Sequence, residues 1–282
     1  MADEPLRHEL YTHGHAPAVV RQHAQRTAGE AAAFLLPHLR PDMSLIDVGC
    51  GPGSITRGLA ERLTAGQVVG LDLSRETLES ARRDAAARGL TNLRYEEGSV
   101  YELSFPDGSF DVAYAHQVLQ HLRERGLALS AMLRVVKPGG VVAVREVDWS
   151  TVAYFPRDPW IDRFIEVHLR TWYRNGGEPQ VGRQLRALFN AAGVASLEIT
   201  ASVWCYATRE ETVEWGESYA DRLLTSPMGE RPVEYGYATR SDIEAMAAAL
   251  RAWGSHPDAL WVFTHVQALG WKARGDARAP AR

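Results

Sequence analysis

The stretch Asp47-Val-Gly-Cys-Gly-Pro-Gly53 decides how this sequence is interpreted. It follows a short apolar segment at residues 44–48 and precedes a helical pattern from Ile55, with Ser54 as the cap of that helix. Glycines between a strand and a helix let the backbone approach a ligand closely, and the start of the helix offers unpaired N–H groups. A tight turn alone needs fewer than three alternating glycines. The loop is therefore predicted to bind a nucleotide-like ligand.

The residues around the loop exclude two common nucleotide sites. No Gly-Lys-Ser/Thr follows the glycines, as a P-loop requires. Ser54 stands where the dinucleotide fingerprint has Gly or Ala. The acid Asp47, two residues before Gly49, would repel a pyrophosphate but suits a cationic ligand. A second acid, Asp72, ends the next strand, where it can accept hydrogen bonds from both hydroxyls of a ribose.

The residues on either side of this loop alternate between strand and helix patterns. Alternation at this spacing predicts βαβ units and a parallel sheet. An Ala-rich helix is expected over residues 17–36, before the first strand. The further strands are expected at residues 67–71, 92–95, 110–115 and 140–147, with helices after Ser74 and around residues 127–136.

The pattern changes after Ser150. Residues 151–180 are aromatic and broken by prolines and glycines, so no long element is expected there. A helix is then expected at 181–192, a strand at 196–206, helices at 210–224 and 241–253, and a last strand at 260–269. The two later helices are interpreted as an insertion between two closing strands. The predicted parts are a cap helix region at 1–40, a binding core at 41–150, a substrate-covering segment with the closing strands at 151–272, and a tail at 273–282.

Composition narrows the class of protein. The chain has 282 residues, of which 45% are hydrophobic, and this content excludes disordered and fibrous classes. A formal charge of −4 gives no sign of a polyanionic partner, and two cysteines do not make a disulfide framework. No apolar run is long enough for a membrane span, and the acidic N-terminus is unlike a secretory signal. We therefore expect a soluble, cytoplasmic monomer or homodimer with no nucleic-acid and no membrane partner.

From residue 43 to about 147 the chain resembles the class I S-adenosylmethionine-dependent methyltransferases. The resemblance is carried by the glycine loop, by Asp72, by Glu97-Gly-Ser-Val100, by Phe105-Pro-Asp-Gly-Ser-Phe-Asp111 and by Leu133-Arg-Val-Val-Lys-Pro-Gly-Gly140. It implies an α/β fold: a Rossmann-like, seven-stranded, mostly parallel sheet with helices on both faces and a reversed last strand. It also implies S-adenosyl-L-methionine as cofactor, bound at the carboxyl ends of the first two strands.

The resemblance assigns parts of that cofactor to residues of this chain. The glycines Gly49, Gly51 and Gly53 would face its methionine and ribose parts, and Asp72 its ribose. Leu73 would lie beside the adenine, which Gly98, Ser99 and Val100 would hold. The family often has Asp where Ser99 stands, so there a hydroxyl would meet the adenine amine. His116 and Gln117, at the end of the fourth strand, complete the expected cofactor contacts.

Within the family the chain is most similar to small-molecule enzymes of ubiquinone and menaquinone biosynthesis, whose N-terminal helix caps the cofactor. Tyr11 and His15 would take part in such a cap, with His15 at the acceptor. Arg26 would pair with the cofactor carboxylate, unless it is a solvated helix arginine. Three histidines near the N-terminus, His13, His15 and His23, have no Cys or Asp beside them, so no metal site is predicted.

His116 and His121 are the candidate catalytic residues, because the end of the fourth strand borders the transferring methyl group in this family. A histidine there can act as a general base or only shape the pocket. Glu146 and Asp148, at the end of the fifth strand, would orient the acceptor or take its proton.

Aromatic residues, including Trp149 and Trp172, gather after residue 148 and are expected to form the acceptor pocket, unless they only pack the insertion helices. Residues 1–27, 150–180 and 205–255 would then act as a lid. The predicted function is methyl transfer to a small hydrophobic or aromatic metabolite, at oxygen, carbon or nitrogen. The alternatives are a cofactor-binding protein of this fold with another reaction or with no catalysis, and an RNA or protein methyltransferase.

Overall fold

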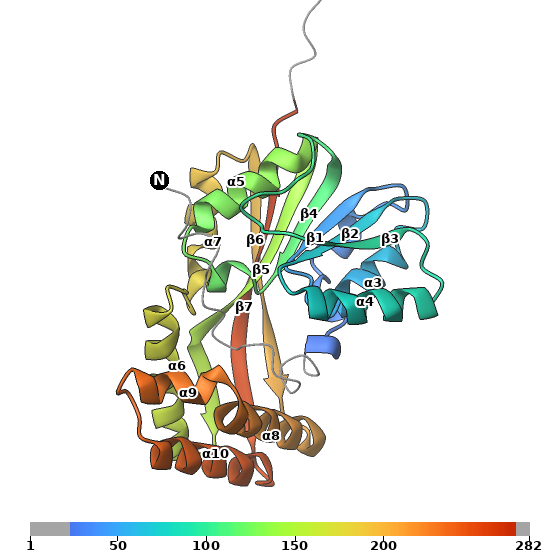
Figure 1. The fold of residues 1–282 in the computed structure, drawn as a ribbon. Coiled ribbons are helices and arrows are strands. Elements are labelled where there is room, and N and C mark those ends of the chain that lie inside the picture. The colour runs from blue at the N-terminus through green and yellow to red at the C-terminus, as the bar shows by residue number, and fades with distance from the viewer. Residues whose placement is uncertain (1–22, 275–282) are drawn as a thin grey trace, which may run out of the picture.

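The strands predicted around the glycine loop form the middle of a seven-stranded sheet in the computed structural model, which describes residues 23–274 (Figure 1). The strands are β1 (Leu45–Val48), β2 (Val68–Asp72), β3 (Leu93–Glu97), β4 (Phe110–His116), β5 (Val136–Phe155), β6 (Ser196–Tyr206) and β7 (Leu260–Trp271). Their order is β3-β2-β1-β4-β5-β7-β6. Strands β1 to β5 pair in parallel, whereas β7 runs antiparallel to both of its neighbours. The expected fold with its reversed last strand is confirmed.

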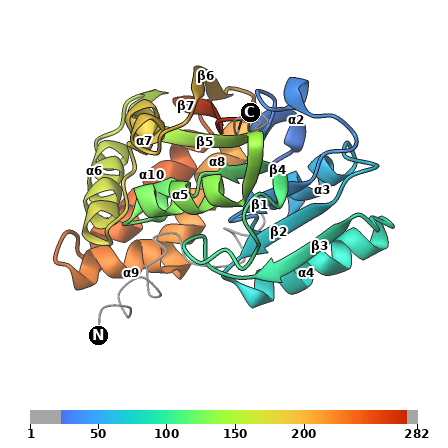
Figure 2. The ribbon, with the colours of Figure 1, turned by 90° about the horizontal axis from the view of Figure 1, so that it is seen from above.

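Helices cover both faces of this sheet, as the view from above shows (Figure 2). They are α2 (Ala28–Ala31), α3 (Ser54–Ala60), α4 (Arg75–Ala87), α5 (Arg125–Val135), α6 (Pro159–Arg174), α7 (Leu185–Ala191), α8 (Arg209–Thr225), α9 (Pro227–Glu234) and α10 (Arg240–Gly254), with 3₁₀ turns η2 (Leu36–His38), η3 (Leu119–His121) and η4 (Val181–Gln184). Side chains alternate along β5: Val142 and Val144 pack with α5 and α7, whereas Val141 and Ala143 pack with α2 and α3. None of the helices described in residues 23–274 is long and apolar enough to cross a membrane.

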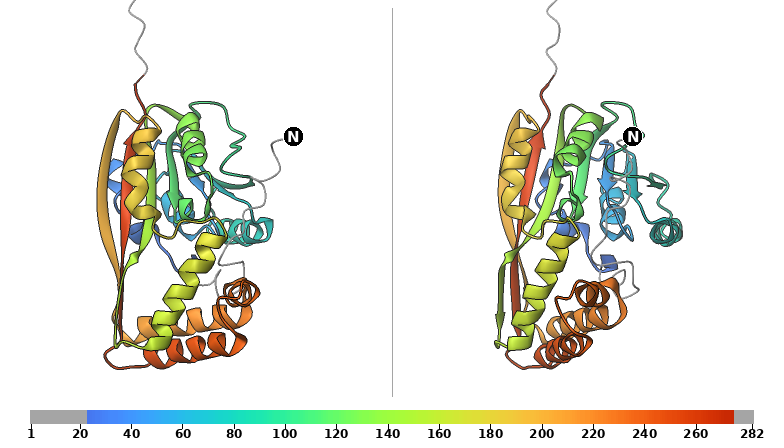
Figure 3. Two further views of the ribbon diagram at one scale, coloured as in Figure 1. Left: turned by 90° about the vertical axis from the view of Figure 1, so that its left-hand side faces the viewer. Right: turned by 60° about the vertical axis from the view of Figure 1, so that its left-hand side comes forward.

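The last three strands extend beyond the core and carry a second group of helices (Figures 1 and 3). We call α6, α8, α9 and α10 the cap. Strand β5 has 20 residues, and its pairing with β7 shifts between Asp148 and Ala153. Beyond this irregularity β5 packs in an aromatic cluster with α6, α8 and α10. The molecule therefore has a core that follows the family pattern and a cap with its own hydrophobic interior.

Two helices were not predicted. Residues 160–174 contain neither Pro nor Gly, and they form α6. Pro159 occupies the first turn of that helix, where its missing N–H costs nothing, and Asp158 caps it by accepting a 2.7 Å hydrogen bond from the Trp160 N–H. The short helix α9 likewise begins with a proline, Pro227. Pro159 thus marks the start of a helix, whereas the sequence analysis interprets it as a break.

The predicted N-terminal helix differs as well. Thr27 has extended backbone angles, φ −112° and ψ 154°, so no helix continues through it. Its hydroxyl instead caps α2, which has only four residues, by accepting a hydrogen bond from the Glu30 N–H. Residues 1–22, which include Tyr11 and His15, lie outside the described part of the chain.

The cap depends on a close approach of α8 and α10 at two glycines. A Cβ added to Gly216 would lie 2.5 Å from the Leu250 carbonyl oxygen, and one added to Gly254 would lie 2.6 Å from that of Thr212. The Thr212 hydroxyl donates a 3.0 Å hydrogen bond to the Gly254 carbonyl. The helices can pack this closely because glycine has no side chain.

We predict that Gly216→Ala lowers the free energy of unfolding by about 1–3 kcal/mol, because the added methyl forces the two helices apart. The matched control is Gly126→Ala in α5, where an added Cβ meets no atom within 4 Å. That change should leave stability equal or raise it by up to about 1 kcal/mol. Urea denaturation of both variants measures the difference, and equal stabilities would refute the close-packing argument.

Candidate active site

The glycine loop has the backbone geometry that its sequence predicts. Gly49, Gly51 and Gly53 have φ values of 70°, 52° and 72°, in the left-handed region that favours glycine. A Cβ added to Gly51 would meet no atom within 4 Å, so this side of the loop is open to a ligand. The loop is held from β2: the Gly51 N–H donates a 2.9 Å hydrogen bond to Oδ2 of Asp72.

Asp72, the residue expected to bind a ribose, has both carboxylate oxygens engaged at the loop. Its Oδ1 accepts a 2.9 Å hydrogen bond from the Ser74 N–H, while Oδ2 accepts the bond from Gly51. A carboxylate oxygen has a second lone pair, so each oxygen can accept one more hydrogen bond. Two adjacent ribose hydroxyls fit this arrangement.

The expected adenine residues lie next to Asp72 at the ends of β2 and β3. Leu73 is 66% exposed, which is unusual for a large apolar side chain between a strand and a helix. The Gly98 N–H donates a 3.1 Å hydrogen bond to the Asp72 carbonyl, and Val100 is buried. The Ser99 hydroxyl accepts a hydrogen bond from the Tyr101 N–H at 3.2 Å. An exposed leucine beside a carboxylate and a glycine turn suits an adenosine group, so the residues fit the cofactor that the sequence implies.

Asp47 lies under the loop and is buried. The Thr56 hydroxyl donates a 2.6 Å hydrogen bond to its Oδ2. Burial raises the pKa of Asp47 to about 7, the Thr56 hydrogen bond opposes this, and the neighbouring Asp72 adds to it. A positive charge bound nearby would favour the ionised form, so the acidic end of the site is suited to a cation.

The chain turns sharply at the end of β4, and this turn contributes further residues to the site. Gln117 has a φ of 56°, which is uncommon for a residue other than glycine. Its N–H donates a 2.8 Å hydrogen bond to the Arg145 carbonyl, and its Nε2 lies 2.7 Å from Nε2 of His265. The turn continues into η3, which brings Gln120 and His121 to the same region as Gln117.

Glu146 stabilises this turn through hydrogen bonds. Its Oε1 accepts hydrogen bonds from the N–H groups of Val118 (2.8 Å) and Leu119 (2.7 Å). The side chain is fully buried, and burial raises its pKa to about 8, against the lowering effect of these hydrogen bonds. Glu146 is therefore a positioning residue for the segment from Gln117 to His121.

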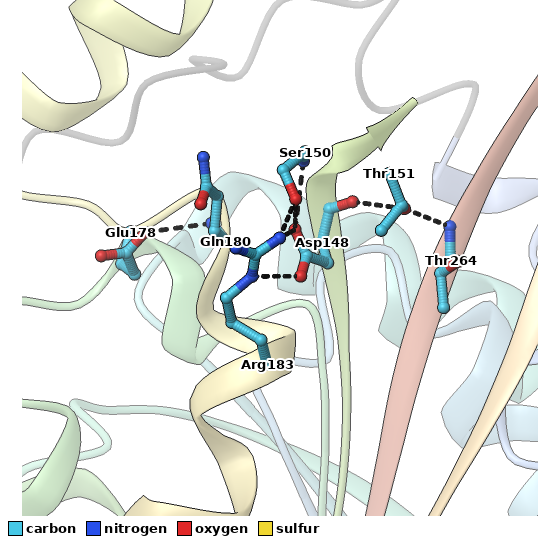
Figure 4. A network of polar contacts seen from close by, with 7 residues as sticks. All are labelled: Asp148, Ser150, Thr151, Glu178, Gln180, Arg183 and Thr264. Carbon is cyan, nitrogen blue, oxygen red and sulfur yellow. Dashed lines mark hydrogen bonds and ion pairs between the residues drawn. The ribbon is translucent and has the colours of Figure 1, made fainter. Parts of the chain in front are cut away.

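Asp148 fixes β5 at its irregularity (Figure 4). Its Oδ2 lies 2.6 Å from Nε of Arg183, and Oδ1 lies 3.1 Å from Nη2 of the same arginine. Ser150 donates a 2.7 Å hydrogen bond to Oδ1. Thr151 donates to the Asp148 carbonyl and accepts from the Thr264 N–H, which ties β5 to β7. These contacts hold the strand where it leaves the core for the cap.

The sequence places Glu146 and Asp148 at the acceptor, but the structure engages both carboxyl groups inside the fold. The reason is the alternation along β5: these residues follow Val142 and Val144 on one face, whereas Val147 and Trp149 face the other way. A cavity is lined by Val147 and Trp149 and by neither carboxylate.

This cavity lies between the core and the cap, next to the turn after β4. Its walls are mostly aromatic and come from β5, β6, β7, α6 and α8. The aromatic lining residues are Trp149, Trp172, Trp204, Tyr206, Trp215, Tyr219 and Phe263. Several pack as parallel faces: the ring centroids of Trp149 and Phe263 are 5.8 Å apart, and those of His121 and Trp172 are 5.1 Å apart. Flat aromatic walls of this kind suit a flat apolar ligand.

The polar side chains that line the cavity are mainly amides, imidazoles and guanidinium groups. Gln117, Gln120 and His121 come from the turn, His23 and Arg26 from the N-terminal side, and Arg222 from α8. No Asp or Glu is among the described lining residues. Arg26 also lies over the Trp204 ring, with its guanidinium carbon 5.7 Å from the ring centroid. The structure thus brings Arg26, Gln117, His121, Trp149 and Trp172 together at one cavity.

The histidines of this region are neutral. Burial lowers the pKa of His121 to about 3, with smaller contributions from Arg26 and His168. Burial also holds the pKa of His116 well below its usual value, and Arg26 and Arg145 lower it further. Within the described residues, neither ring nitrogen of His116 has a hydrogen-bond partner. Protonation of either ring would put one more positive charge among arginines, so this setting disfavours a general base.

Sequence reasoning missed Arg222 and Phe263. A signal for Arg222 was present, because Trp215, Tyr219 and Arg222 stand four and three residues apart and so share one helix face. Phe263 lies on β7, which was predicted as a strand, but nothing in the local pattern tells which end of that strand reaches the cavity.

Comparisons with known proteins agree with this geometry. Residues 46–144 match the family described as "Methyltransferase domain". The chain is 34% identical over 232 residues to an uncharacterized methyltransferase of Schizosaccharomyces pombe, and the match covers 79% of this chain and 83% of that protein. It is 31% identical over 167 residues to the demethylmenaquinone methyltransferase of Geobacillus stearothermophilus, covering 55% of this chain and 71% of that enzyme.

Solved structures share the fold. The crystal structure of the YcgJ protein from Bacillus subtilis superposes with a TM-score of 0.58 at 17% sequence identity, over 87% of this chain and 99% of that one. At this identity the likeness concerns the arrangement of strands and helices. Methyltransferase-domain proteins thus resemble this chain in sequence, and a solved structure shares its fold.

We predict that Asp72→Ala weakens binding of S-adenosylhomocysteine by about 1–3 kcal/mol, because it removes the ribose acceptor and frees the Gly51 N–H. Titration calorimetry measures the change, with thermal melting as a check on folding. Glu79→Ala, an exposed change on α4, is the control and should bind like the parent. If Asp72→Ala and the parent have the same dissociation constant, Asp72 does not take part in cofactor binding.

A second prediction concerns the pH dependence of stability. The pKa of Glu146 is higher in the folded protein than in an unfolded chain, so its ionisation opposes folding. The free energy of unfolding should therefore fall between about pH 5 and 8, by up to about 1.4 kcal/mol per pH unit relative to Glu146→Gln. Glutamine keeps an acceptor for the Val118 and Leu119 N–H groups without this titration. Urea denaturation across this pH range tests the slope, with exposed Glu76→Gln as control; a constant difference would contradict the prediction.

Proposed function

Because this chain belongs to the class I S-adenosylmethionine-dependent methyltransferases, we propose that it methylates a small, flat, apolar molecule held in its aromatic cavity. The observation that carries the proposal is the position of this cavity. It adjoins Gln117 and His121, at the carboxyl end of β4, and Asp72 with the glycine loop lies at the same edge of the sheet. Parallel α/β sheets bind ligands at that edge.

The reaction needs alignment more than covalent help from the protein. The glycine loop and Asp72 would hold S-adenosylmethionine, which would supply an electrophilic methyl group with the sulfur as its leaving atom. The glycine loop and Asp72 hold one reactant, and the walls formed by Trp149, Trp172 and Trp204 hold the other. Positioning both reactants and excluding water supplies most of the acceleration in such a reaction.

The roles of the two histidines follow from their surroundings. The pKa of His121 is about 3 and that of His116 is also lowered, so neither ring readily takes a proton from the acceptor. We assign both to shaping the cavity: His121 stacks on Trp172, and His116 lies 5.8 Å from Trp204 between ring centroids. The acceptor then loses any proton to solvent, or reacts as an ion.

The cap forms the cover of the acceptor in this proposal. Helix α6 contributes Trp172, and α8 contributes Trp215 and Tyr219, which are fully or almost fully buried. Residues 151–272 thereby serve as the substrate-covering segment and the closing strands. A recess lined by buried aromatic side chains suits a small metabolite better than an RNA or a protein chain. Tyr11 and His15 stay predicted parts of the cover.

Production of S-adenosylhomocysteine tests the function. The protein is incubated with S-adenosyl-L-methionine and a panel of flat phenols, quinones and aromatic acids, with short RNAs and peptides as alternative acceptors. The proposal expects methylation within the aromatic group only. Methylation of RNA or peptides, or a reaction that leaves the cofactor intact, would overturn it.

We predict that Trp204→Leu raises the KM for an accepted aromatic substrate at least about tenfold, because the half-buried ring is a wall of the cavity. Binding of S-adenosylhomocysteine should change by less than about twofold, since Trp204 lies on β6 and apart from the glycine loop. Trp160→Leu is the control: this tryptophan is 41% exposed on α6 and lines no part of the cavity. Equal KM values for the acceptor in the two variants would show that the acceptor does not bind in this cavity.

A further inference from the structure

A second recess lies beside the aromatic cavity. Its walls come from β5, β6, α8 and the segment at α2. Its volume is about 610 Å³, and sites for small molecules commonly have about 300–1,000 Å³. The recess shares Trp204, Tyr206 and Trp215 with the aromatic cavity. A ligand that fills this larger space therefore lies against the same aromatic side chains.

Arg145 on β5 places a buried positive charge in the wall of this recess. The residue is fully buried, and its Nη2 donates a 3.1 Å hydrogen bond to the Ser202 hydroxyl. Its Nε and Nη1 have no hydrogen-bond partner among residues 23–274. Burial lowers the pKa of Arg145 to about 10, which leaves the guanidinium protonated at neutral pH. Buried donors nearly always have an acceptor, so the recess holds donors that lack one.

The groups around Arg145 leave its charge without a counterion. The Trp204 ring centroid lies 4.5 Å from its guanidinium carbon, and a ring face attracts a cation without neutralising it. Arg26, the other cation of the recess, lies over the same ring and brings no negative charge. Glu146, the next residue on β5, accepts hydrogen bonds from two backbone N–H groups of the turn after β4.

Ser202 adds a second donor beside Arg145. Its hydroxyl oxygen accepts hydrogen bonds from Nη2 of Arg145 at 3.1 Å and from Nε2 of Gln267 at 2.8 Å. Both lone pairs of the oxygen are then used, so its proton is available to a further acceptor. Ser202 also lines the recess. One part of the wall therefore offers a guanidinium group and a hydroxyl group to an incoming acceptor.

The acids of the recess are exposed and are used elsewhere. Glu211 accepts a 3.0 Å hydrogen bond from the Thr208 N–H in the cap of α8, and Glu214 accepts one from the Gln25 side chain. Glu30 accepts a hydrogen bond at the start of α2. Three exposed carboxylates disfavour a ligand with two negative charges, whereas one buried guanidinium matches a single negative charge. This balance favours a carboxylate over a phosphate.

We infer that this recess binds a carboxylate group of the methyl acceptor, and that Arg145 and Ser202 donate hydrogen bonds to it. The inference rests on the proposed function and adds an anionic group to its substrate class. Arg145 pairs with His116 across β4 and β5, and its carbonyl accepts the Gln117 N–H, so the recess adjoins the end of β4. A carboxylate supplies both the negative charge and the acceptors that Arg145 lacks, whereas an uncharged ligand leaves the buried charge unpaired.

Pairs of acids and amides test this inference on the full chain saturated with S-adenosylhomocysteine. Benzoate and 2-naphthoate are compared with benzamide and 2-naphthamide, which have nearly the same shape without the charge. Quenching of tryptophan fluorescence reports binding, because Trp204 and Trp215 line the recess. The parent should bind each acid at least about tenfold more tightly than its amide, since hydrogen bonds to charged groups are the stronger kind. Phenyl phosphate should bind more weakly than benzoate, and tighter binding would overturn the choice of a carboxylate.

Three variants identify the arginine. Arg145→Met should abolish the preference for acids, and Arg145→Lys should keep part of it, because lysine keeps the charge without the fork of donors. Arg157→Met is the matched control and should keep all of it, since Arg157 also lies on an aromatic ring but outside the recess. Binding of S-adenosylhomocysteine should change less than about twofold in Arg145→Met, because hydrogen bonds to charged groups are lost only from the acceptor. A large loss of that binding would assign Arg145 to the cofactor instead and overturn the inference.

Stability separates a binding role of Arg145 from a structural one. An unpaired buried charge can be replaced by an apolar side chain of similar volume at little cost or with a gain. The urea midpoint of Arg145→Met should therefore equal or exceed that of the parent while the preference for acids is lost. A lower midpoint with an unchanged preference would make the role structural and overturn the inference. If Arg145→Met does not fold, the ratios in the parent and in Arg145→Lys decide.

The outcomes also separate this inference from the proposed function. If the parent binds acids and amides equally well, the role of Arg145 is overturned and the aromatic acceptor stands. If none of the probes binds while S-adenosylhomocysteine does, the aromatic acceptor is overturned together with the inference.

Discussion

Side-chain alternation along β5 is the constraint that links the cofactor site, the turn after β4 and the cap. This strand begins inside the parallel sheet and ends among the cap helices. On one face Glu146 accepts the hydrogen bonds that hold the turn, and Asp148 pairs with Arg183 where the strand leaves the core. On the other face Val147 and Trp149 line the cavity. A shift of one residue in the register would turn two carboxylates into the cavity and leave the turn without its support.

The parts that sequence predicts well are those set by short-range chemistry. Three glycines with positive φ, the cap at Ser74 and the apolar run of β1 each depend on near neighbours along the chain. The errors arise where distant contacts decide. Pro159 starts α6 because the residues after it bury an aromatic face on the cap, and a proline alone does not distinguish a start from a break. The direction of Glu146 depends on register with β4 and β7, which no local pattern reports.

The site carries opposite charges at its two ends. Asp47 and Asp72 lie at the glycine loop, whereas Arg26 and Arg222 line the cavity and Arg145 lies beside it. A cationic methyl donor would be favoured at the acidic end of the site. Burial is the main reason why the pKa of His121 is lowered, and the charge of Arg26 lowers it further.

Burying Arg145 and Arg222 is costly, and aromatic rings beside the arginines of this region reduce that cost. The guanidinium carbons of Arg145 and Arg26 lie 4.5 Å and 5.7 Å from the centroid of the Trp204 ring. Fully buried Arg145 also donates a 3.1 Å hydrogen bond to Ser202 on β6. Ring faces attract cations without neutralising them, whereas a carboxylate would cancel their field. Trp204 has both roles: it forms a flat wall of the cavity and stabilises the neighbouring arginine. The flatness and the charge of the pocket are therefore consequences of one set of contacts.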